Sequence, residues 1–370
     1  MTTQVTGDSG DTTGTLDEAL ERLHASGPER RGWLSNHAPM AVEALVRRGQ
    51  APTVHRWIDS YRAKLEDMPG PESPVTDANW PEALGDPRRL GDWTRYFARR
   101  VEERDWREVL ALWWPRLLPG ISAAATHPVI RTGHAVRTLL GEGGGTEPRR
   151  AELAHALGYW AARHQVLEGV GRLPAAPTAY EGLEDVPRVE PQSGGIRERL
   201  ARITALPDRP GAGLTGVAGS GGGGTAEGAG ARSAEAAREA LVEMVRAATH
   251  RYATHAHGEP VMLVHAATAP NAVLRVLPAL PRELWVPSAD AAWSASTAVT
   301  AAYGPASGTA APSVGGLSAQ EVFARAAAHG DEHTIKLADT AWDVASWAAG
   351  DEASALGAMV CAVEQIEPLF

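Results

Sequence analysis

The spacing of apolar residues constrains the fold of this chain more than any other feature. Apolar side chains recur every three to four residues through long segments, including 91–118, 149–166, 233–257 and 289–303. This period is typical of helices that bury one face. Alternating strand patterns and the Asn-Gly or Asp-Gly signals of tight hairpins are nearly absent. The sequence therefore predicts an all-α protein in which helices are separated by Pro-rich loops.

Composition along the 370 residues predicts two helical halves. Residues 1–14 are rich in Gly, Thr and Asp and are expected to be disordered. The first helical half covers 15–171. Pro, Gly, Arg and Ser dominate 172–232, which predicts a long, flexible central insertion. The second half covers 233–370, and because 44% of the chain is hydrophobic we expect both halves to share one core.

Charge and cysteine content exclude several classes of function. The net charge of −10 disfavours nucleic acid as a partner, since phosphate binding requires a basic face. Cys361 is the single cysteine, so neither an intrachain disulfide nor a cysteine-based metal cluster can form. The polar segment Met1–Thr15 does not resemble a signal peptide, and no run of about 18 uncharged apolar residues predicts a membrane span. We therefore expect a cytoplasmic protein without a membrane partner.

Histidine is the residue type that points to chemistry. Several of the thirteen histidines lie within apolar runs, among them His37, His127 and His265, and His329 and His333 flank Gly-Asp-Glu. Burial keeps an imidazole neutral and leaves a ring nitrogen free to bind a transition metal. A buried histidine is more often an ordinary core residue satisfied by hydrogen bonds. The shared setting of these residues favours a metal site without deciding the matter.

The segment 329–339 carries a lysine on an otherwise apolar turn. If the segment is helical, His329, His333 and Lys336 share one face. Lys336 either pairs with Glu332 or Asp339, or its pKa is lowered by burial. A lysine of the second kind can take up carbon dioxide and become a carbamate, which is an anionic oxygen ligand.

Two further polar residues follow His127 at helical spacing. His134 lies seven residues later and is expected to face the same way. Arg131 lies between them, either in a surface ion pair or as a hydrogen-bond donor to a substrate oxygen. The tryptophans of 93–114, with Trp285 and Trp293, either line an aromatic pocket or belong to the core.

Four short motifs in this order resemble the questin oxidase-like family. They are Ser35–Met40, Leu117–Arg131, Leu263–Asn271 and Asp331–Lys336, and the resemblance extends over about 15–365. It implies a helical oxygenase of secondary metabolism that uses dioxygen on a quinone or hydroquinone ring of an anthraquinone or related aromatic polyketide. The outcome is either Baeyer–Villiger-type oxygen insertion or ring cleavage by dioxygenation. The implied partners are a small aromatic substrate and dioxygen.

The resemblance also implies a ligand set, since some family members resemble non-haem iron enzymes with four histidines and a carboxylated lysine. The residues carried over as ligands of Fe(II) are His37, His127, His265, His333 and a carboxylated Lys336. The substrate-facing catalytic candidates are His134, His329 and Arg131. Arg131 and His134 stand where the fungal pattern has His and Tyr, and the Gly-rich segment 210–232 also differs. These differences concern the substrate more than the metal ligands.

Two other interpretations remain open from the sequence. In the first, no metal is involved, and the histidines and Lys336 act as bases on a hydroquinone with NADPH or the substrate as electron source. No Gly-x-Gly-x-x-Gly motif indicates a bound dinucleotide, and the run Gly219–Gly224 is interpreted as linker. In the second, the protein is a non-catalytic helical scaffold. A scaffold predicts that the five candidate ligands lie far apart.

Overall fold

The computed structural model describes residues 12–141, 143–212, 226–348 and 350–370. Helices dominate these residues, and the strands are two short pairs, so the all-α prediction is confirmed. Most of the segment predicted to be disordered, and the run Gly219–Gly224, lie outside the described residues. Thr12 already belongs to the first helix.

The described helices and strands follow one another as the apolar periodicity predicts. The first half contains α1 (Thr12–His24), β1 (Glu29–Arg30), β2 (Leu34–Ser35), α2 (Ala38–Arg47), α3 (Val54–Tyr61), α4 (Trp80–Ala83), α5 (Leu90–Glu103), α6 (Trp106–Leu117), α7 (His127–Leu140) and α8 (Glu147–Arg163). The middle contains β3 (Gly171–Leu173), α9 (Ala179–Glu184), α10 (Ile196–Leu200) and β4 (Ala205–Pro207). The second half contains α11 (Ala226–His255), α12 (Pro260–Val276), α13 (Trp285–Tyr303), α14 (Ala319–His329), α15 (Glu332–Trp347) and α16 (Glu352–Gln365). The strands pair as β1 with β2, antiparallel, and β3 with β4, parallel.

Side-chain caps set several of these helix boundaries. The hydroxyl of Ser318 accepts from the Glu321 amide while the Glu321 carboxylate accepts from the Ser318 amide, and these two bonds form a capping box at the start of α14. The predicted helix over 91–118 is divided into α5 and α6, because the Asp105 carboxylate accepts from the Arg107 amide (2.8 Å) and starts a new helix.

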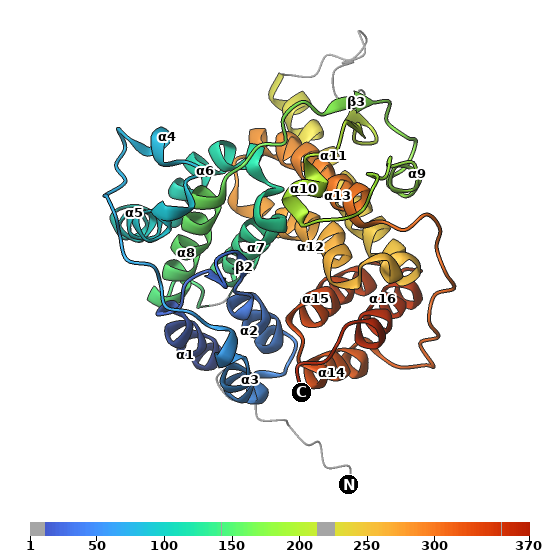
Figure 1. The fold of residues 1–370 in the computed structure, drawn as a ribbon, viewed down its shortest axis with the longest axis horizontal. Coiled ribbons are helices and arrows are strands. Elements are labelled where there is room, and N and C mark those ends of the chain that lie inside the picture. Colours follow the sequence, from blue (N-terminus) through green and yellow to red (C-terminus); the bar gives the residue numbers. More distant parts are fainter. Residues whose placement is uncertain (1–11, 142, 213–225, 349) are drawn as a thin grey trace.

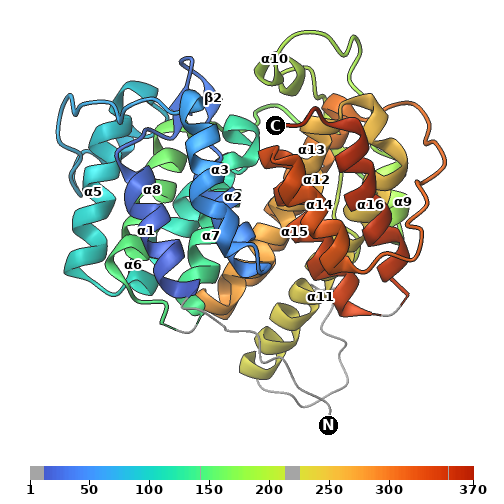
Figure 2. The same cartoon turned by 90° about the horizontal axis from the view of Figure 1, so that it is seen from below.

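The two halves meet along two pairs of helices that carry the candidate ligands. Figures 1 and 2 show α1–α8 on one side and α11–α16 on the other. Between them α7 packs against α12, and α2 packs against α15. Buried apolar residues of both halves form a continuous cluster across α5–α8 and α11–α13. A second cluster joins α1–α3 to α14–α16.

The tryptophans predicted either to line a pocket or to form the core belong mainly to the core. Trp93 and Trp113 are fully buried and pack edge to face, 5.4 Å apart, within a group that includes Tyr96 and Phe97. Trp293 is also buried, and its indole N–H donates to the carbonyl of Pro207 (2.8 Å). Aromatic rings therefore fill the core of the first half, and Trp293 fills the space between α13 and Pro207.

Part of the predicted central insertion is folded against the second half. Val186, Val189, Ile203 and Leu206 are buried against α13, and the Val189 amide donates to the Ala301 carbonyl (2.9 Å). Pro and Gly dominate this stretch, but its few apolar residues are enough to cover one face of a helix. The flexible connection expected over 172–232 therefore contains packed elements up to residue 207, and α11 begins within it at Ala226.

Helix α12 is the one described segment with the length and composition of a membrane span. The span covers Pro260–Ala279, and 72% of it is buried inside the protein. It packs against α7, α11, α13 and α15, and its side chains form the centre of the shared core. We therefore describe α12 as a core helix.

Candidate metal centre

Four helices bring the predicted metal ligands to one place. His37 immediately precedes α2, and His127 is the first residue of α7. His265 lies in the first half of α12, and Lys336 follows His333 by three residues in α15. These are the same two helix pairs that join the halves of the protein, so each half contributes to the site.

Local backbone geometry places the two ligands of the first half. The Asn36 side chain accepts from the Ala38 amide (3.0 Å) and turns the chain into α2 just after His37. Before His127, Ala124, Ala125 and Thr126 have φ values of 45°, 55° and 65°. This left-handed conformation is costly for residues with a side chain, roughly 1–2 kcal/mol each. The surrounding structure therefore holds the entrance to α7 in a strained form.

The four imidazoles converge closely. Nε2 of His127 lies 2.7 Å from Nε2 of His37 and 2.8 Å from Nε2 of His265. The ring of His333 has its centroid 4.5 Å from that of His37 and 5.6 Å from that of His265. One ring nitrogen each of His37, His127 and His333 lies within 4.8 Å of the other two. The structure thus brings together all four histidines predicted as ligands.

Hydrogen bonds to the opposite ring nitrogens assign the protons of two of these histidines. Nδ1 of His127 donates to the Ala124 carbonyl (2.6 Å), and Nδ1 of His265 donates to the Met262 carbonyl (2.9 Å). A carbonyl oxygen only accepts, so each neutral ring carries its proton on Nδ1 and a lone pair on Nε2. Two lone pairs therefore face each other at 2.8 Å. A cation between them would remove their repulsion.

A proton on one of the Nε2 atoms could in principle serve as that cation, but burial disfavours protonation of these imidazoles. It lowers the pKa of His37, His127 and His265 well below the usual value, and the nearby Lys336 charge lowers it further. Neutral imidazoles held in this way, with Nδ1 bonded to a fixed acceptor, are the donors that transition metals bind. The residues present therefore fit a metal ion.

Lys336 lies at the cluster without a counter-ion of its own. It is fully buried, and its Nζ has no hydrogen-bond partner among the described residues. Burial lowers the pKa of its amine to about 7, partly offset by Glu332 and Asp331. The two partners considered from the sequence are engaged elsewhere: Glu332 with Lys64, and Asp339 with arginines. The geometry agrees with the interpretation in which burial makes the amine reactive.

His134 belongs to a different site. Its Nδ1 donates to the Glu43 carboxylate (2.6 Å), and Arg137 bonds both Glu43 and Asp339. Ligand atoms of Glu43, His134 and Asp339 lie within 4.8 Å of one another, a spacing that a metal ion could bridge. Guanidiniums already pair with both carboxylates, however: Arg137 bonds Glu43 and Asp339, and Arg48 and Arg275 also pair with Asp339. We therefore interpret this group as an ionic network, two helical turns along α7 from His127.

The other two predicted catalytic residues also have partners outside the histidine cluster. Arg131 forms a two-pronged ion pair with Glu152 (2.6 and 2.8 Å), and both side chains are buried rather than at the surface. His329 ends α14, Gly330 adopts φ 78°, and Asp331 caps the start of α15, so His329 does not share a helix face with His333. Its Nε2 donates to the Ile366 carbonyl (2.9 Å).

Sequence reasoning missed Tyr61, which supports His37 from α3. Its hydroxyl accepts from the His37 amide (3.2 Å), and its ring stacks on Trp57 at 4.7 Å. Burial, with the nearby Glu332 charge, raises the pKa of the phenol, so it stays protonated. Trp57 and Tyr61 lie four residues apart, which is helical spacing, but this spacing gives no sign of the contact with His37.

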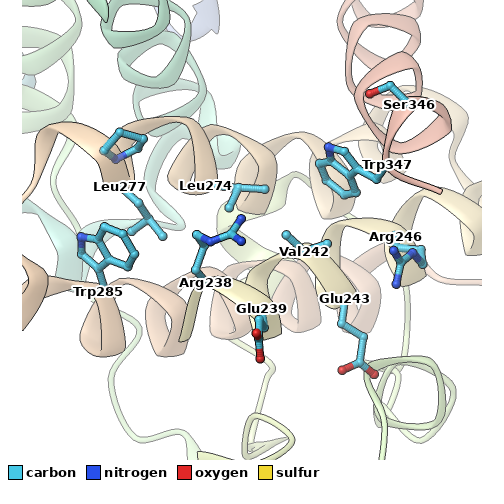
Figure 3. A pocket seen from close by; sticks show the side chains of 11 residues that line it. Arg238, Glu239, Val242, Glu243, Arg246, Leu274, Leu277, Trp285, Ser346 and Trp347 are labelled. Atoms are coloured by element: carbon cyan, nitrogen blue, oxygen red, sulfur yellow. The ribbon is translucent and has the colours of Figure 1, made fainter. Parts of the chain in front are cut away.

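A groove on the described surface lies away from the histidine cluster. It measures about 910 Å³ and is lined by residues of α11, α12 and α15, with Trp285 and Trp347 shown in Figure 3. On α12, Leu274 lies nine residues beyond His265, or roughly 13 Å along a helix with a rise of 1.5 Å per residue. The groove is therefore near the opposite ends of the helices that carry the cluster.

Fold and site together define a class: a helical protein with a buried centre of four imidazoles and one lysine amine. The family model described as Questin oxidase-like matches residues 34–141, which contain His37 and His127. The resemblance predicted from the sequence is therefore confirmed over this stretch, and the family indicates an oxygenase-type function. The remaining candidate ligands, His265, His333 and Lys336, lie beyond the matched residues. No curated protein matches the chain.

Proposed function

We propose that this protein is an oxygenase that uses dioxygen to oxidise or cleave the quinone or hydroquinone ring of an aromatic polyketide. The proposed reaction takes place at a metal centre held by His37, His127, His265, His333 and Lys336. The ion best suited to the donor set and the chemistry is Fe(II). Both outcomes expected from the resemblance, oxygen insertion and ring-cleaving dioxygenation, are compatible with this site.

The close approach of unprotonated imidazole nitrogens carries this proposal. Two Nε2 lone pairs 2.8 Å apart, in rings whose Nδ1 protons are bonded to carbonyls, are unfavourable without a cation. A non-catalytic scaffold predicts candidate positions scattered beyond about 10 Å, with no reason for them to meet. The convergence of ligands from four helices argues for a metal-dependent function over that alternative.

When bound, a ferrous ion supplies the one-electron chemistry that lets dioxygen react with a closed-shell aromatic ring. The protein's own contribution is the environment. Burial keeps three imidazoles neutral, so the five side chains hold a divalent ion without adding positive charge. Exclusion of water strengthens each electrostatic interaction with a charged phenolate substrate.

Lys336 has a specific part in the proposed site. At a pKa of about 7, a large share of its amine is unprotonated near neutral pH. The Nζ lone pair can then form a bond to carbon dioxide, releasing one proton and leaving a carbamate anion. That anion would place an oxygen ligand beside four neutral imidazoles and lower the net charge of the centre from +2 to about +1.

Metal analysis of the purified protein tests the proposal. The wild-type chain is expected to retain about one equivalent of iron, whereas His265→Ala and Lys336→Ala are expected to lose it together with oxygen consumption on a hydroquinone. His155→Ala serves as the matched control, because His155 is largely buried but lies outside the cluster. A wild-type protein without transition metal, and active mutants, would refute the metal-dependent function.

The pKa of Lys336 favours a second candidate function, a metal-free oxygenase. In that case the neutral Nζ takes the phenolic proton of a hydroquinone, and the resulting anion reacts with dioxygen using electrons from the substrate or from NADPH. Activity measured aerobically with and without a strong chelator separates the two functions. Full activity in chelator, with loss in Lys336→Ala, would favour the metal-free reaction.

A further inference from the structure

Glu332 is a buried carboxylate at the edge of the histidine cluster. It is the first residue of α15, is only 2% exposed, and lies between His37 and Lys64. Its Oε1 is 3.6 Å from Nδ1 of His37. On the other side, Nζ of Lys64 donates to both carboxylate oxygens (3.3 and 3.1 Å). Burial of a charged group is costly, so a buried Glu332 carboxylate next to a candidate ligand indicates a specific role for it.

The four histidines differ in what faces Nδ1, the ring nitrogen opposite to Nε2. Backbone carbonyls accept from His127 and His265, as described above. Nδ1 of His333 lies 3.6 Å from Asp331, whose carboxylate already caps the start of α15. Nδ1 of His37 has no hydrogen-bond partner among the described residues. The nearest carboxylate is that of Glu332, which a small rotation of the imidazole would bring into hydrogen-bonding range.

We propose that Glu332 is the positioning residue for His37. It holds the His37 ring with the Nδ1 proton directed at its carboxylate, which leaves the Nε2 lone pair directed at the cluster. This role rests on the proposed metal-dependent function. Lys64, whose side chain is 28% exposed, fixes Glu332 from the outer side. A carboxylate in this place also makes the imidazole a stronger donor to a metal ion.

Direct ligation by Glu332 is the competing role. Ligand atoms of Asp331, Glu332 and His333 lie within 4.8 Å of one another, so a second metal ion could bridge them. Two observations disfavour it. The ammonium of Lys64 already contacts both Glu332 oxygens, and Asp331 accepts from two amides at the positive end of α15. Both features oppose another cation at this position.

Cobalt binding to the full-length chain tests the assignment. The chain is first stripped of metal and then titrated with Co²⁺ in bicarbonate buffer, with visible absorption and calorimetry as readouts. Wild type is expected to bind one Co²⁺ per chain. Glu332→Gln, which keeps an acceptor but loses the charge, is expected to bind about tenfold more weakly, and Glu332→Leu about a hundredfold more weakly. The control Glu152→Gln, another buried glutamate with a basic partner, should bind as wild type does.

A purely structural role is separated by the thermal unfolding of the metal-free proteins. Positioning predicts weaker Co²⁺ binding in Glu332→Gln, with a changed visible spectrum and an unfolding midpoint near that of wild type. Unchanged affinity and spectrum in folded Glu332→Gln and Glu332→Leu would overturn the assignment while leaving the metal centre intact. A stoichiometry that falls from two to one would overturn it in favour of ligation. Absence of Co²⁺ binding by wild type would overturn both the assignment and the metal-dependent function.

Discussion

The same four helices carry two buried polar clusters, and these clusters differ in whether their polar groups are paired with one another. One is the histidine cluster with Lys336, and the other is the ionic network around Asp339, one turn further along α15. The network consists of Glu43, Arg48, His134, Arg137, Arg275, Asp339 and Asp343. Its three carboxylates match three guanidiniums, so it is neutral by itself. The histidine cluster contains only bases, with lone pairs that face one another.

This difference indicates which of the two clusters is stable without a bound ligand. Burial alone would raise the pKa of Glu43, but Arg137 and His134 hold it at about 2. The network therefore remains charged and paired near neutral pH. In the histidine cluster, burial lowers the pKa of three imidazoles and the lysine amine, and no carboxylate among the described residues forms a hydrogen bond with them. The charges of the ionic network balance one another, which indicates a structural role. The histidine cluster lacks such a balance, which indicates that it binds a ligand from outside the chain.

The largest effect is expected from a substitution that removes a carboxylate from the ionic network. Asp339→Ala leaves Arg137 and Arg275 buried without their shared carboxylate, so we expect a loss of about 3–5 kcal/mol in unfolding free energy. Urea denaturation of the metal-free protein measures this loss. Asp59→Ala, which removes an exposed ion pair with Arg22, should cost less than about 1 kcal/mol. Equal losses for the two variants would contradict the structural role of the network.

A pH titration of stability probes the histidine cluster. The folded-state pKa of Lys336 is about 7, below its ordinary value, so the unfolded chain binds one more proton between these two values. Unfolding free energy should therefore rise with pH, by up to about 1.4 kcal/mol per unit between about 7 and 10.4. Below about pH 7 the amine is protonated in both the folded and the unfolded state, so Lys336 causes no pH dependence of stability there. In carbon dioxide-free buffer, Lys336→Met should lose this rise, and an unchanged slope would argue against a neutral amine.

The smallest effect concerns the backbone at the entrance to α7. Ala124→Gly relieves a left-handed conformation and is expected to stabilise the fold by up to about 1 kcal/mol, the side-chain penalty less the entropy that glycine adds to the unfolded chain. Ala135→Gly, in the regular part of α7 near the network, should destabilise it by about 1 kcal/mol or more. Thermal unfolding of both variants checks the opposite signs. A loss of stability in both would mean that the turn before His127 is not strained.

Helices and ligands differed in how far the sequence could predict them. The period of apolar residues located most helices, because it depends on residues that are close in the sequence. The Gly-Asp pair at 330–331 is a signal for the end of one helix and the start of another, and it would have separated His329 from His333. The packed elements after residue 171 were missed because sparse apolar residues lie among many Pro and Gly.

The candidate site depended on a different kind of information. Composition and spacing marked histidines in apolar runs, but only the resemblance to a family joined His37, His127, His265 and His333 into one set. Helix rotation and packing decide which faces meet, and spacing within a single segment does not reveal them. This is why His134, two turns from His127 and on a similar face, was expected near the cluster but pairs with Glu43 instead. The contacts of Glu332 and Tyr61 with His37 were hidden for the same reason.

The division of the ligands between the two halves has a consequence for the newly made chain. His37 and His127 leave the ribosome first, followed by His265 and finally by His333 and Lys336. Under the proposed function, the two imidazoles of the first half alone would make a weak site, and Lys336 is added near the end of synthesis. A metal ion would then be bound tightly only by a chain whose helices α12 and α15 have docked against the first half. The order of synthesis would thereby protect the unfinished polypeptide from oxidation by that ion.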